Sequence, residues 1–350
     1  MKHNDSFSAP TEEQINWKMV ETYLRFHLEE LSGESMQIKK FSEGYSNLTY
    51  LIQIGDWEGV LRRPPFGSIP PKAHDMEREY RILQKIHPVF PLAPKPYLFC
   101  DDHSVMDKHF YVMEKKSGVV LDDQLPSEYE TGETARIISE TVVNTLVQLH
   151  SIDIEKEGLV ELGHPEGYLE RQIHGWIKRY QRVKTDEING VDEIEKWLAG
   201  NIPLSQQATI VHNDIKLNNM MLSSEDPSKA VGVFDWELST VGDPLTDLAS
   251  ALVHWAEKGD PETGLATITT APGFIRRREF LEQYALKTKR DVSQIDYYLT
   301  FAFYKLAAIL QQINYRWKQG EVKDGRFSSL NIGIHNLLQM SMRAKNRNLL

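Results

Sequence analysis

Residues 211–222 read VHNDIKLNNMML, and this stretch decides how the rest of the chain is interpreted. It places a histidine, an aspartate, a lysine and two asparagines between apolar flanks. Polar groups at this density cost free energy to bury unless each finds a partner or a task. A function for this stretch must use Asp214, a lysine two residues later and an asparagine five residues later.

A second aspartate motif follows shortly afterwards. The turn-like segment EDPSK (225–229) separates two short apolar runs, and this pattern predicts a β-hairpin. The hairpin would return Asp235, in the run AVGVFDWE, close to Asp214 and Asn219. Two carboxylates and an amide oxygen are hard-oxygen ligands suited to Mg²⁺ together with phosphate oxygens.

Phosphoryl transfer from ATP uses all of these groups. In that reaction an aspartate accepts the proton of the attacking hydroxyl, while an asparagine and a second aspartate hold Mg²⁺. A lysine beside the first aspartate neutralises charge on the transferred group. The motif therefore predicts an active site that uses ATP and Mg²⁺.

The bulk composition limits the alternatives. The 350 residues carry 40 basic and 50 acidic side chains, which argues against nucleic acid as a partner because phosphate binding needs a basic face. The single cysteine, Cys100, excludes a disulfide within the chain and is expected to be buried. No signal peptide is apparent, and the longest apolar run (299–310) contains Lys305 and is too short to span a bilayer. We expect that run to be a buried helix of a cytoplasmic protein, with no membrane contact and no partner protein indicated.

The first third of the chain predicts a small β-rich lobe. A helix is expected at 11–32, with Thr11 and Gln14 as a capping box and Gly33 at its end. Five β-forming runs and one amphipathic helix follow, the strands at 36–43, 46–54, 58–65, 97–102 and 108–115 and the helix at 73–87. The pattern predicts an antiparallel sheet with one helix inserted after the third strand.

Helical periodicity dominates the rest of the chain. Helices are expected at 131–151, 167–184, 191–200, 244–258, 274–288, 291–318 and 327–346. Short strands return only between 209 and 238. We therefore predict an α+β, two-lobed fold, composed of a nucleotide-binding lobe (1–115), a connector (116–126) and a helical lobe (127–350) that contains a catalytic loop (209–223) and a metal motif (231–238).

These motifs resemble those of a known family. VHNDIKLNN with VFDWE is similar to the protein-kinase-like superfamily, whose catalytic loop reads H-R-D-x-x-x-x-N and whose metal motif reads D-F-G. DWE followed by STVGDPLTDLA looks more like the aminoglycoside phosphotransferase and choline kinase branch. LRRPPFG, EREYRIL and FDWELSTVGDPLTDLA resemble the kinase-like domain fused to some acyl-CoA dehydrogenases and its free-standing bacterial relatives. The resemblance implies a protein-kinase-like fold, but the segment after FDWE is too short for the activation segment of a protein kinase.

The resemblance also implies roles for the catalytic block. Asp214 matches the catalytic base, and Asn219 and Asp235 match the metal ligands. Lys216 stands where Ser/Thr kinases place a phosphate-contacting lysine. His212 matches a histidine that supports the loop by packing and hydrogen bonding.

Nucleotide contacts are implied for the first lobe. Glu79 matches the glutamate of the structural ion pair, and Arg62 stands where its usual lysine partner would be, with Arg63 as the alternative. The other implied contacts lie in the phosphate-covering loop and in the backbone beside adenine, at Gly44, Ser46, Asn47, Met113, Glu114 and Lys115.

Several other residues have simpler interpretations. Asp243 and Asp247 are expected to be structural, and the family places an aspartate at position 247 to brace the catalytic loop. A set of aromatic and histidine side chains is expected to pack in the core rather than to line a substrate cleft: Trp176, Tyr180, Trp197, His254 and Trp255.

The sequence thus predicts an ATP-dependent phosphotransferase that acts on a hydroxyl of a small molecule. A catalytically weak or inactive nucleotide-binding module is the alternative, because Arg62 replaces a lysine and the phosphate-covering loop has only Gly44. A metal hydrolase built on His212 is a third reading, although it lacks further clustered histidines. The acceptor stays open among aminoglycosides, amino alcohols and hydroxyacyl thioesters.

Overall fold

The chain folds into a β-rich unit and a helical unit. The computed structural model describes residues 15–29, 31–41, 47–66, 74–122, 124–126, 129, 131–321 and 325–350. The first unit comprises Met1–Ser117 and Gly232–Glu237, and the second comprises Gly118–Val231 and Leu238–Leu350. The α+β class predicted from the sequence is confirmed.

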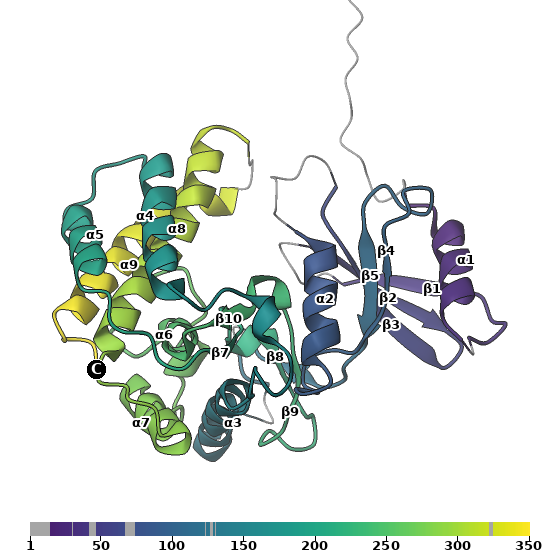
Figure 1. Ribbon diagram of the computed structural model, residues 1–350, viewed down its shortest axis with the longest axis horizontal. Coiled ribbons are helices and arrows are strands. Elements are labelled where there is room, and N and C mark those ends of the chain that lie inside the picture. Colours follow the sequence, from purple (N-terminus) through teal and green to yellow (C-terminus); the bar gives the residue numbers. More distant parts are fainter. Residues whose placement is uncertain are drawn as a thin grey trace, which may run out of the picture. The chain divides into compact units, whose positions relative to one another are not determined.

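The first unit is built around an antiparallel sheet of order β1-β2-β3-β5-β4. The strands are β1 (Gln37–Lys40), β2 (Leu48–Ile54), β3 (Trp57–Arg63), β4 (Pro96–Cys100) and β5 (Phe110–Glu114). A two-residue turn joins β2 to β3, and in it Gly55 adopts a φ of +57°, a conformation that glycine reaches without steric cost. Helices α1 (Trp17–His27) and α2 (Met76–Ile86) lie on opposite faces of this sheet (Figure 1).

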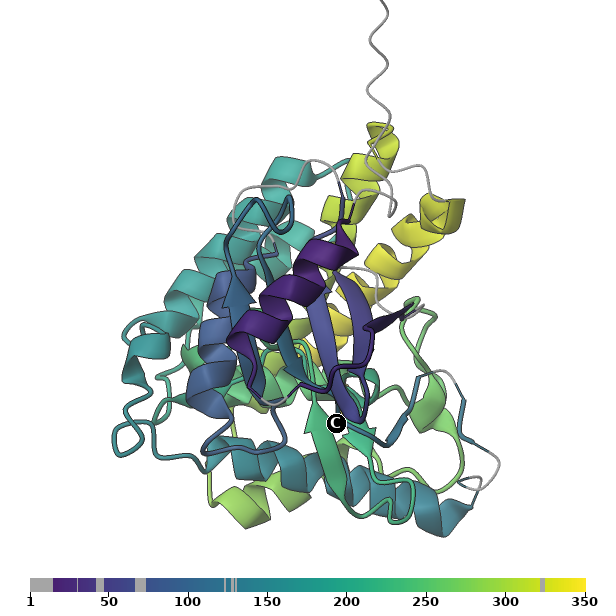
Figure 2. The same cartoon turned by 90° about the vertical axis from the view of Figure 1, so that its right-hand side faces the viewer.

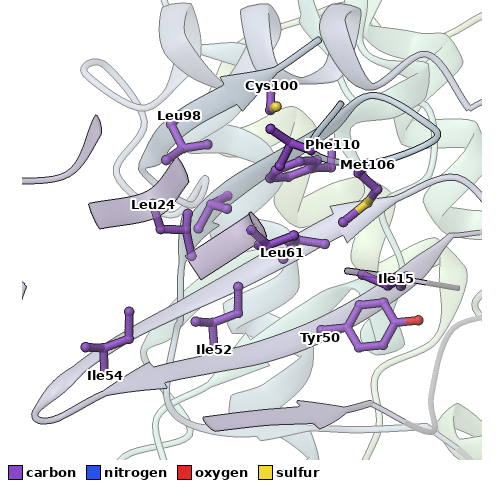
Figure 3. Close-up of a cluster of buried hydrophobic side chains, with 13 residues drawn as sticks. Ile15, Leu24, Tyr50, Ile52, Ile54, Leu61, Leu98, Cys100, Met106 and Phe110 are labelled. Carbon is purple, nitrogen blue, oxygen red and sulfur yellow. The ribbon is translucent and has the colours of Figure 1, made fainter. Parts of the chain in front are cut away.

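The core of this unit lies between the sheet and α1. Tyr50, Ile52 and Ile54 alternate along β2, so their side chains share one face of the sheet. α1 lies across that face and contributes Val20 and Leu24 to the same cluster (Figures 2 and 3). Cys100 belongs to this cluster, as its predicted burial implied.

The first helix is shorter than predicted. It begins at Trp17, because the side chain of Asn16 accepts the Met19 N–H and acts as the N-cap. It ends at His27, where Leu28 turns to an extended conformation, rather than at 32. The predicted capping box at Thr11 and Gln14 lies outside the described residues.

Helix α2 buries a carboxylate on the other face of the sheet. Asp75 caps the helix by accepting the Arg78 N–H at 3.0 Å. The buried positions follow helical spacing and include Met76, Ile82, Leu83 and Ile86. Glu79 occupies the same face and is only 1% exposed, so its charge requires a partner within the unit.

The second unit is mainly helical, and all seven helices predicted for it are present. They are α3 (Gly132–His150), α4 (Tyr168–Val183), α5 (Val191–Gly200), α6 (Pro244–Val253), α7 (Arg277–Thr288), α8 (Ile295–Lys318) and α9 (Leu330–Lys345). The largest discrepancy is at α6, which ends at Val253 instead of 258 because the chain turns at His254 and Trp255.

Short strands position the loops of this unit. They are β6 (Val119–Val120), β7 (Thr209–Val211), β8 (Met220–Leu222), β9 (Ala230–Val233) and β10 (Thr240–Gly242). β8 and β9 are neighbours in one small sheet, which confirms the predicted hairpin. β7 pairs with β10 in another.

Helix α8 contains the longest apolar run of the sequence. Leu299, Phe303 and Ala307 are completely or almost completely buried, and the helix packs against α4, α6 and α9. The prediction of a buried core helix at 299–310 is therefore confirmed. Across the described ranges, we find no helix with the length and apolar character needed to cross a membrane.

The aspartate motif after β9 groups with the first unit, whereas the sequence assigns 231–238 to the helical lobe. The Val233 N–H donates to the Leu92 carbonyl at 2.8 Å. Trp236 is fully buried, and its ring lies 5.8 Å from that of Phe90. These contacts between segments far apart in sequence explain the grouping. The first unit also continues to Ser117, into the predicted connector.

Candidate active site

The catalytic loop connects β7 to β8 in the second unit and holds Asp214 in a polar frame. Its Oδ2 lies 3.0 Å from the Lys216 ammonium and accepts the Asn219 side-chain amide at 2.8 Å. The same amide group donates to the Asp214 carbonyl at 2.9 Å. The Asp214 side chain remains 23% exposed. Sequence motif and structure thus agree in bringing Asp214, Lys216 and Asn219 together.

Asp247, on α6, fixes the start of this loop. Its carboxylate accepts the backbone N–H groups of His212 at 2.6 Å and Asn213 at 2.8 Å. It also lies 3.2 Å from His150 Nε2. Burial by itself would raise the pKa of Asp247, but the hydrogen bond and charge of His150, with the contribution of His212, keep it below its usual value. This is the bracing role that the resemblance implied for position 247.

His212 and Asn213 shape the loop from within. His212 is completely buried, and its Nδ1 accepts the backbone N–H of Asp214 at 3.3 Å. Asn213 adopts a φ of +69°, a left-handed conformation that is uncommon for residues other than glycine. Its side chain donates to the Leu238 carbonyl at 3.0 Å and accepts the Tyr168 hydroxyl at 3.3 Å. Both residues therefore position Asp214 rather than present reactive groups.

His254, expected to be a core residue, lies instead beside Asp214. Its Nε2 is 3.8 Å from Asp214 Oδ1, and its side chain is 17% exposed. Burial lowers the pKa of His254 to about 4, although the charge of Asp214 opposes the shift. The imidazole is thus neutral near pH 7.

Lys305 also lies near Asp214, and Trp176 lies beside Lys305. The sequence did not indicate Lys305, and for Trp176 it favoured core packing over a substrate cleft. Asp214 and Asp247 are the anions that act on the Lys305 ammonium, yet burial outweighs them and lowers the pKa of Lys305. Trp176, expected in the core, is half-buried, and Lys305 Nζ lies 5.7 Å from its ring centroid. The available signal for Lys305 was its position as the one charge in an apolar run of α8. Of the other core predictions, those for Tyr180 and Trp255 are confirmed because both are buried, whereas Trp197 is only half-buried and packs on Tyr297.

The first unit contains a separate group of three charges. Arg62, on β3, lies between two carboxylates, with its Nε 3.3 Å from Glu79 Oε2 and its Nη2 2.5 Å from Asp235 Oδ1. Burial disfavours the charge, but the carboxylates, led by Glu79, outweigh it and raise the pKa of Arg62. Burial, partly opposed by Arg62, raises the pKa of Glu79 to about 7. Arg63 is fully buried and pairs with Asp107 instead, so Arg62 is the partner of Glu79.

Asp235 sits in a strained turn of this unit. Its φ is +64°, in the left-handed region, and its side chain is 38% exposed. Residues held in sparsely populated backbone regions cluster at functional sites, where the surrounding structure compensates for the strain. Here the Arg62 pair and the buried Trp236 provide that compensation.

Asn47 begins the next polar group of the first unit. Its amide donates to Glu237 Oε2 at 3.3 Å, and its oxygen lies 2.7 Å from His74 Nδ1. The carbonyl of Glu237 accepts a hydrogen bond from Arg78. The sequence did not indicate His74 or Glu237 as part of this group. Gly44 and Ser46, also predicted to cover phosphates, lie outside the described residues.

The predicted adenine-binding backbone lies at the end of β5. Met113 is buried and pairs with Val60 of β3. The Glu114 N–H donates to the Lys95 carbonyl at 2.8 Å. The side chains of Glu114 and Lys115 are paired with Lys116 and Glu58, respectively. This arrangement is consistent with a role for the backbone rather than for these side chains.

The predicted site residues thus fall into two groups. Asp214, Lys216, Asn219 and His212 lie together in the second unit. Arg62, Glu79 and Asp235 lie together in the first, and Asn47 contacts the adjacent Glu237. The convergence of Asp235 with Asp214 and Asn219 around one cation stays a prediction.

Comparison with known proteins supports the reading of these motifs. A family model described as the phosphotransferase enzyme family matches residues 37–280. Acyl-CoA dehydrogenase family member 11 of Mus musculus is 32% identical over 326 residues, which cover 91% of this chain and 42% of the mouse protein. The chain therefore spans less than half the length of this relative.

Solved structures share the fold. A candidate aminoglycoside phosphotransferase from Ralstonia eutropha JMP134 has a TM-score of 0.80 and 27% identity, over 95% of this chain and 98% of that one. Choline kinase from Cryptosporidium parvum Iowa II has a TM-score of 0.65 and 13% identity, over 96% and 98% of the two chains. These likenesses confirm the predicted protein-kinase-like fold. Because the family model covers most of the sequence, the chain belongs to the phosphotransferase enzyme family.

Proposed function

We propose that the protein transfers the terminal phosphoryl group of ATP to a hydroxyl of a small molecule, with Asp214 as the base. The observation that carries the proposal is the frame around Asp214. One carboxylate oxygen, Oδ2, is held by both Lys216 and Asn219. The other, Oδ1, has His254 Nε2 at 3.8 Å, beyond hydrogen-bond distance. Oδ1 is therefore the atom that would accept the proton of the attacking hydroxyl.

The loop around Asp214 suits this task. The Asp247 carboxylate fixes the backbone at His212 and Asn213, so the base is positioned before any substrate binds. Lys216 supplies a positive charge directly beside the base. In the proposal, this ammonium moves from Asp214 to the transferred phosphoryl group as negative charge develops there.

In the proposal, Asn219 and Asp235 supply ligands for Mg²⁺. The Asn219 amide nitrogen is used by Asp214, which leaves Oδ1, the ligating atom, for a cation. Asp235 offers a carboxylate that is 38% exposed and contacts Arg62 through Oδ1. An amide oxygen and a carboxylate are the donors that Mg²⁺ accepts alongside substrate phosphates. When bound, Mg²⁺ would neutralise charge on the phosphate oxygens during transfer.

Arg62 is proposed to contact the nucleotide phosphates. Its guanidinium already bridges Glu79 and Asp235, and this fork geometry can also hold phosphate oxygens. Replacement of the usual lysine by Arg62 is therefore compatible with nucleotide binding. The names of the similar proteins refer to different compounds, namely aminoglycosides, choline and acyl-CoA. The class of the acceptor therefore has to be inferred from the residues of this chain.

A coupled assay of ATP consumption over aminoglycosides, amino alcohols and hydroxyacyl-CoA thioesters tests the proposal. With the acceptor found, Asp214→Asn should lower kcat by about a hundredfold to ten-thousandfold, because proton transfer is lost. The affinity for ATP with Mg²⁺, measured by titration calorimetry, should be largely retained.

Asp226→Asn is the matched control, because Asp226 lies in the turn of the β8–β9 hairpin and bonds only local groups. Its kcat should equal that of the unmodified protein. Undiminished turnover in Asp214→Asn would refute the role of the base. Nucleotide binding with no turnover of any acceptor would favour the alternative of a nucleotide-binding module.

A further inference from the structure

Helix α4 carries an unusual charge for this chain. The protein has a net charge of −10, yet α4 contains one acidic and four basic side chains, which are Glu170, Arg171, Lys178, Arg179 and Arg182. The start of the helix contacts the catalytic loop, where the Tyr168 hydroxyl donates to Asn213. The acidic balance of the whole protein therefore does not describe the surroundings of Asp214.

Two cations gather at one aromatic ring on this helix. The Arg179 guanidinium carbon lies 4.7 Å from the ring centroid of Trp176, and Lys305 Nζ lies 5.7 Å from it. Both distances fall within the range of cation–π attraction. The ring holds the two positive groups near each other without neutralising their charge.

Lys305 lacks a carboxylate partner at close range. Among the described residues, no aspartate or glutamate forms an ion pair with it. The nearby anions are already engaged, Asp214 by Lys216 and Asn219, and Asp247 by His150 and two backbone N–H groups. Burial penalises this ammonium, as its lowered pKa shows. A partly buried cation of this kind is stabilised by a ligand that brings a negative charge.

The positive groups near Lys305 and His254 would disfavour a cationic acceptor. Lys216, Lys305 and Arg179 are positive, and burial keeps His254 neutral near pH 7. An ammonium group placed beside Trp176 would meet two like charges instead of an acidic cluster. A negative group at the same place would gain a charge-assisted hydrogen bond from Lys305 and a second contact from Arg179.

We infer that Lys305 and Arg179, assembled on Trp176, form an anion-binding subsite for the acceptor, so the preferred acceptor is a small hydroxylated compound that carries a carboxylate or phosphate. The inference rests on the proposed function for the role of the hydroxyl, which would lie at Asp214 Oδ1. The binding of the anion at this subsite does not depend on turnover. Lys305 is the principal binding residue because it is the less exposed of the two cations.

Titration calorimetry with four probes tests the subsite. Hydroxybutyrate supplies a carboxylate, glycerol phosphate a phosphate, butanediol no charge and choline a positive charge. We expect one of the two anions to bind at least about tenfold more tightly than butanediol and choline, and the comparison of the two identifies the anionic group.

Variants then locate the binding. Lys305→Met keeps the length of the side chain and should weaken anion binding about tenfold, whereas Lys305→Arg should restore most of it. Arg179→Gln should have a smaller effect because the side chain is exposed. Lys178→Gln is the matched control, an exposed lysine on the same helix, and should bind the anion within about twofold of the unmodified protein.

Asp214→Asn separates this inference from the proposed function. In that variant, the anion should bind at least as tightly, since a negative neighbour of Lys305 is removed, while turnover of the acceptor should fall sharply. Tighter binding of choline or butanediol than of either anion would overturn the subsite. Equal effects of Lys305→Met and Lys178→Gln would overturn it as well. If the unmodified protein binds the anion through Lys305 but turns over no acceptor, the proposed function is refuted and the anion-binding subsite is not.

Discussion

The two charged groups of the molecule are stabilised in opposite ways. In the first unit, Arg62 forms ion pairs through its side chain with both Glu79 and Asp235. In the second, the Asp247 carboxylate holds backbone N–H groups of the catalytic loop, and Asp214 stays partly exposed. In the first unit, charged side chains stabilise one another. In the second, a carboxylate stabilises backbone N–H groups.

This difference has consequences for each group. A cluster of mutually paired charges responds to the protonation or loss of any member, because the remaining charges are buried without compensation. A loop held through its backbone keeps its shape when the reacting side chain is replaced. We therefore expect Asp214 to be replaceable with little loss of stability, and Asp247 not to be.

The largest effect is expected for Asp247→Ala. The change leaves His150 and two buried backbone N–H groups without their acceptor, so the free energy of unfolding should fall by about 3–5 kcal/mol. Urea unfolding measures the loss. Ser250→Ala is a control on the same helix, because it removes one hydrogen bond to the Asn213 carbonyl and should cost about 1 kcal/mol. Equal losses in the two variants would contradict the bracing role of Asp247.

The pH dependence of stability should have opposite signs in the two units. Burial raises the pKa of Glu79 to about 7, so its contribution is complete below its ordinary value of 4.5 and is lost as the pH rises through about 7. Burial lowers the pKa of His254 to about 4, so its contribution is present above its ordinary value of 6.5 and is lost as the pH falls through about 4. Each contribution is at most about 3 kcal/mol.

Two variants separate these contributions. The free energy of unfolding of Glu79→Gln should decline less than that of the unmodified protein between about pH 5 and pH 8. For His254→Gln, the free energy of unfolding should fall less steeply than that of the unmodified protein as the pH drops from about 6.5 to about 4. Urea unfolding across this range measures both. Identical pH profiles in all three proteins would show that neither group titrates differently on folding.

The smallest effect is expected for Arg62→Lys. A lysine keeps the charge but cannot bridge Glu79 and Asp235 with separate nitrogens, so stability should fall by about 1–2 kcal/mol. Under the proposed function, the KM for ATP should rise about tenfold while kcat changes less. An unchanged KM and unchanged stability would show that the fork geometry of Arg62 is irrelevant. Lys85→Arg, on an exposed position of α2, is the control for a change between the two basic residues.

The local sequence pattern was sufficient to predict the helices of the second unit and to identify the motif VHNDIKLNN. The helices of the second unit follow from apolar spacing, and VHNDIKLNN places Asp214, Lys216 and Asn219 within one short loop. The predicted start of the first helix was wrong, because the helix begins at Trp17 after Asn16, whose side chain caps it. Apolar periodicity does not record which residue caps a helix.

The sequence by itself determined the fold class, because that depends on local spacing. It also indicated the family and the residues that match its catalytic loop, because the motifs resemble those of that family. Only the tertiary structure decided that Arg62 pairs with Asp235 across 173 positions. It also placed His254 and Lys305 near Asp214, and Trp176 beside Lys305. The physical reason is that the partner of a buried charge is chosen by packing between distant segments. Lys305 illustrates this, since one charge in an apolar helix is only an irregularity until the ring of Trp176 is found beside it.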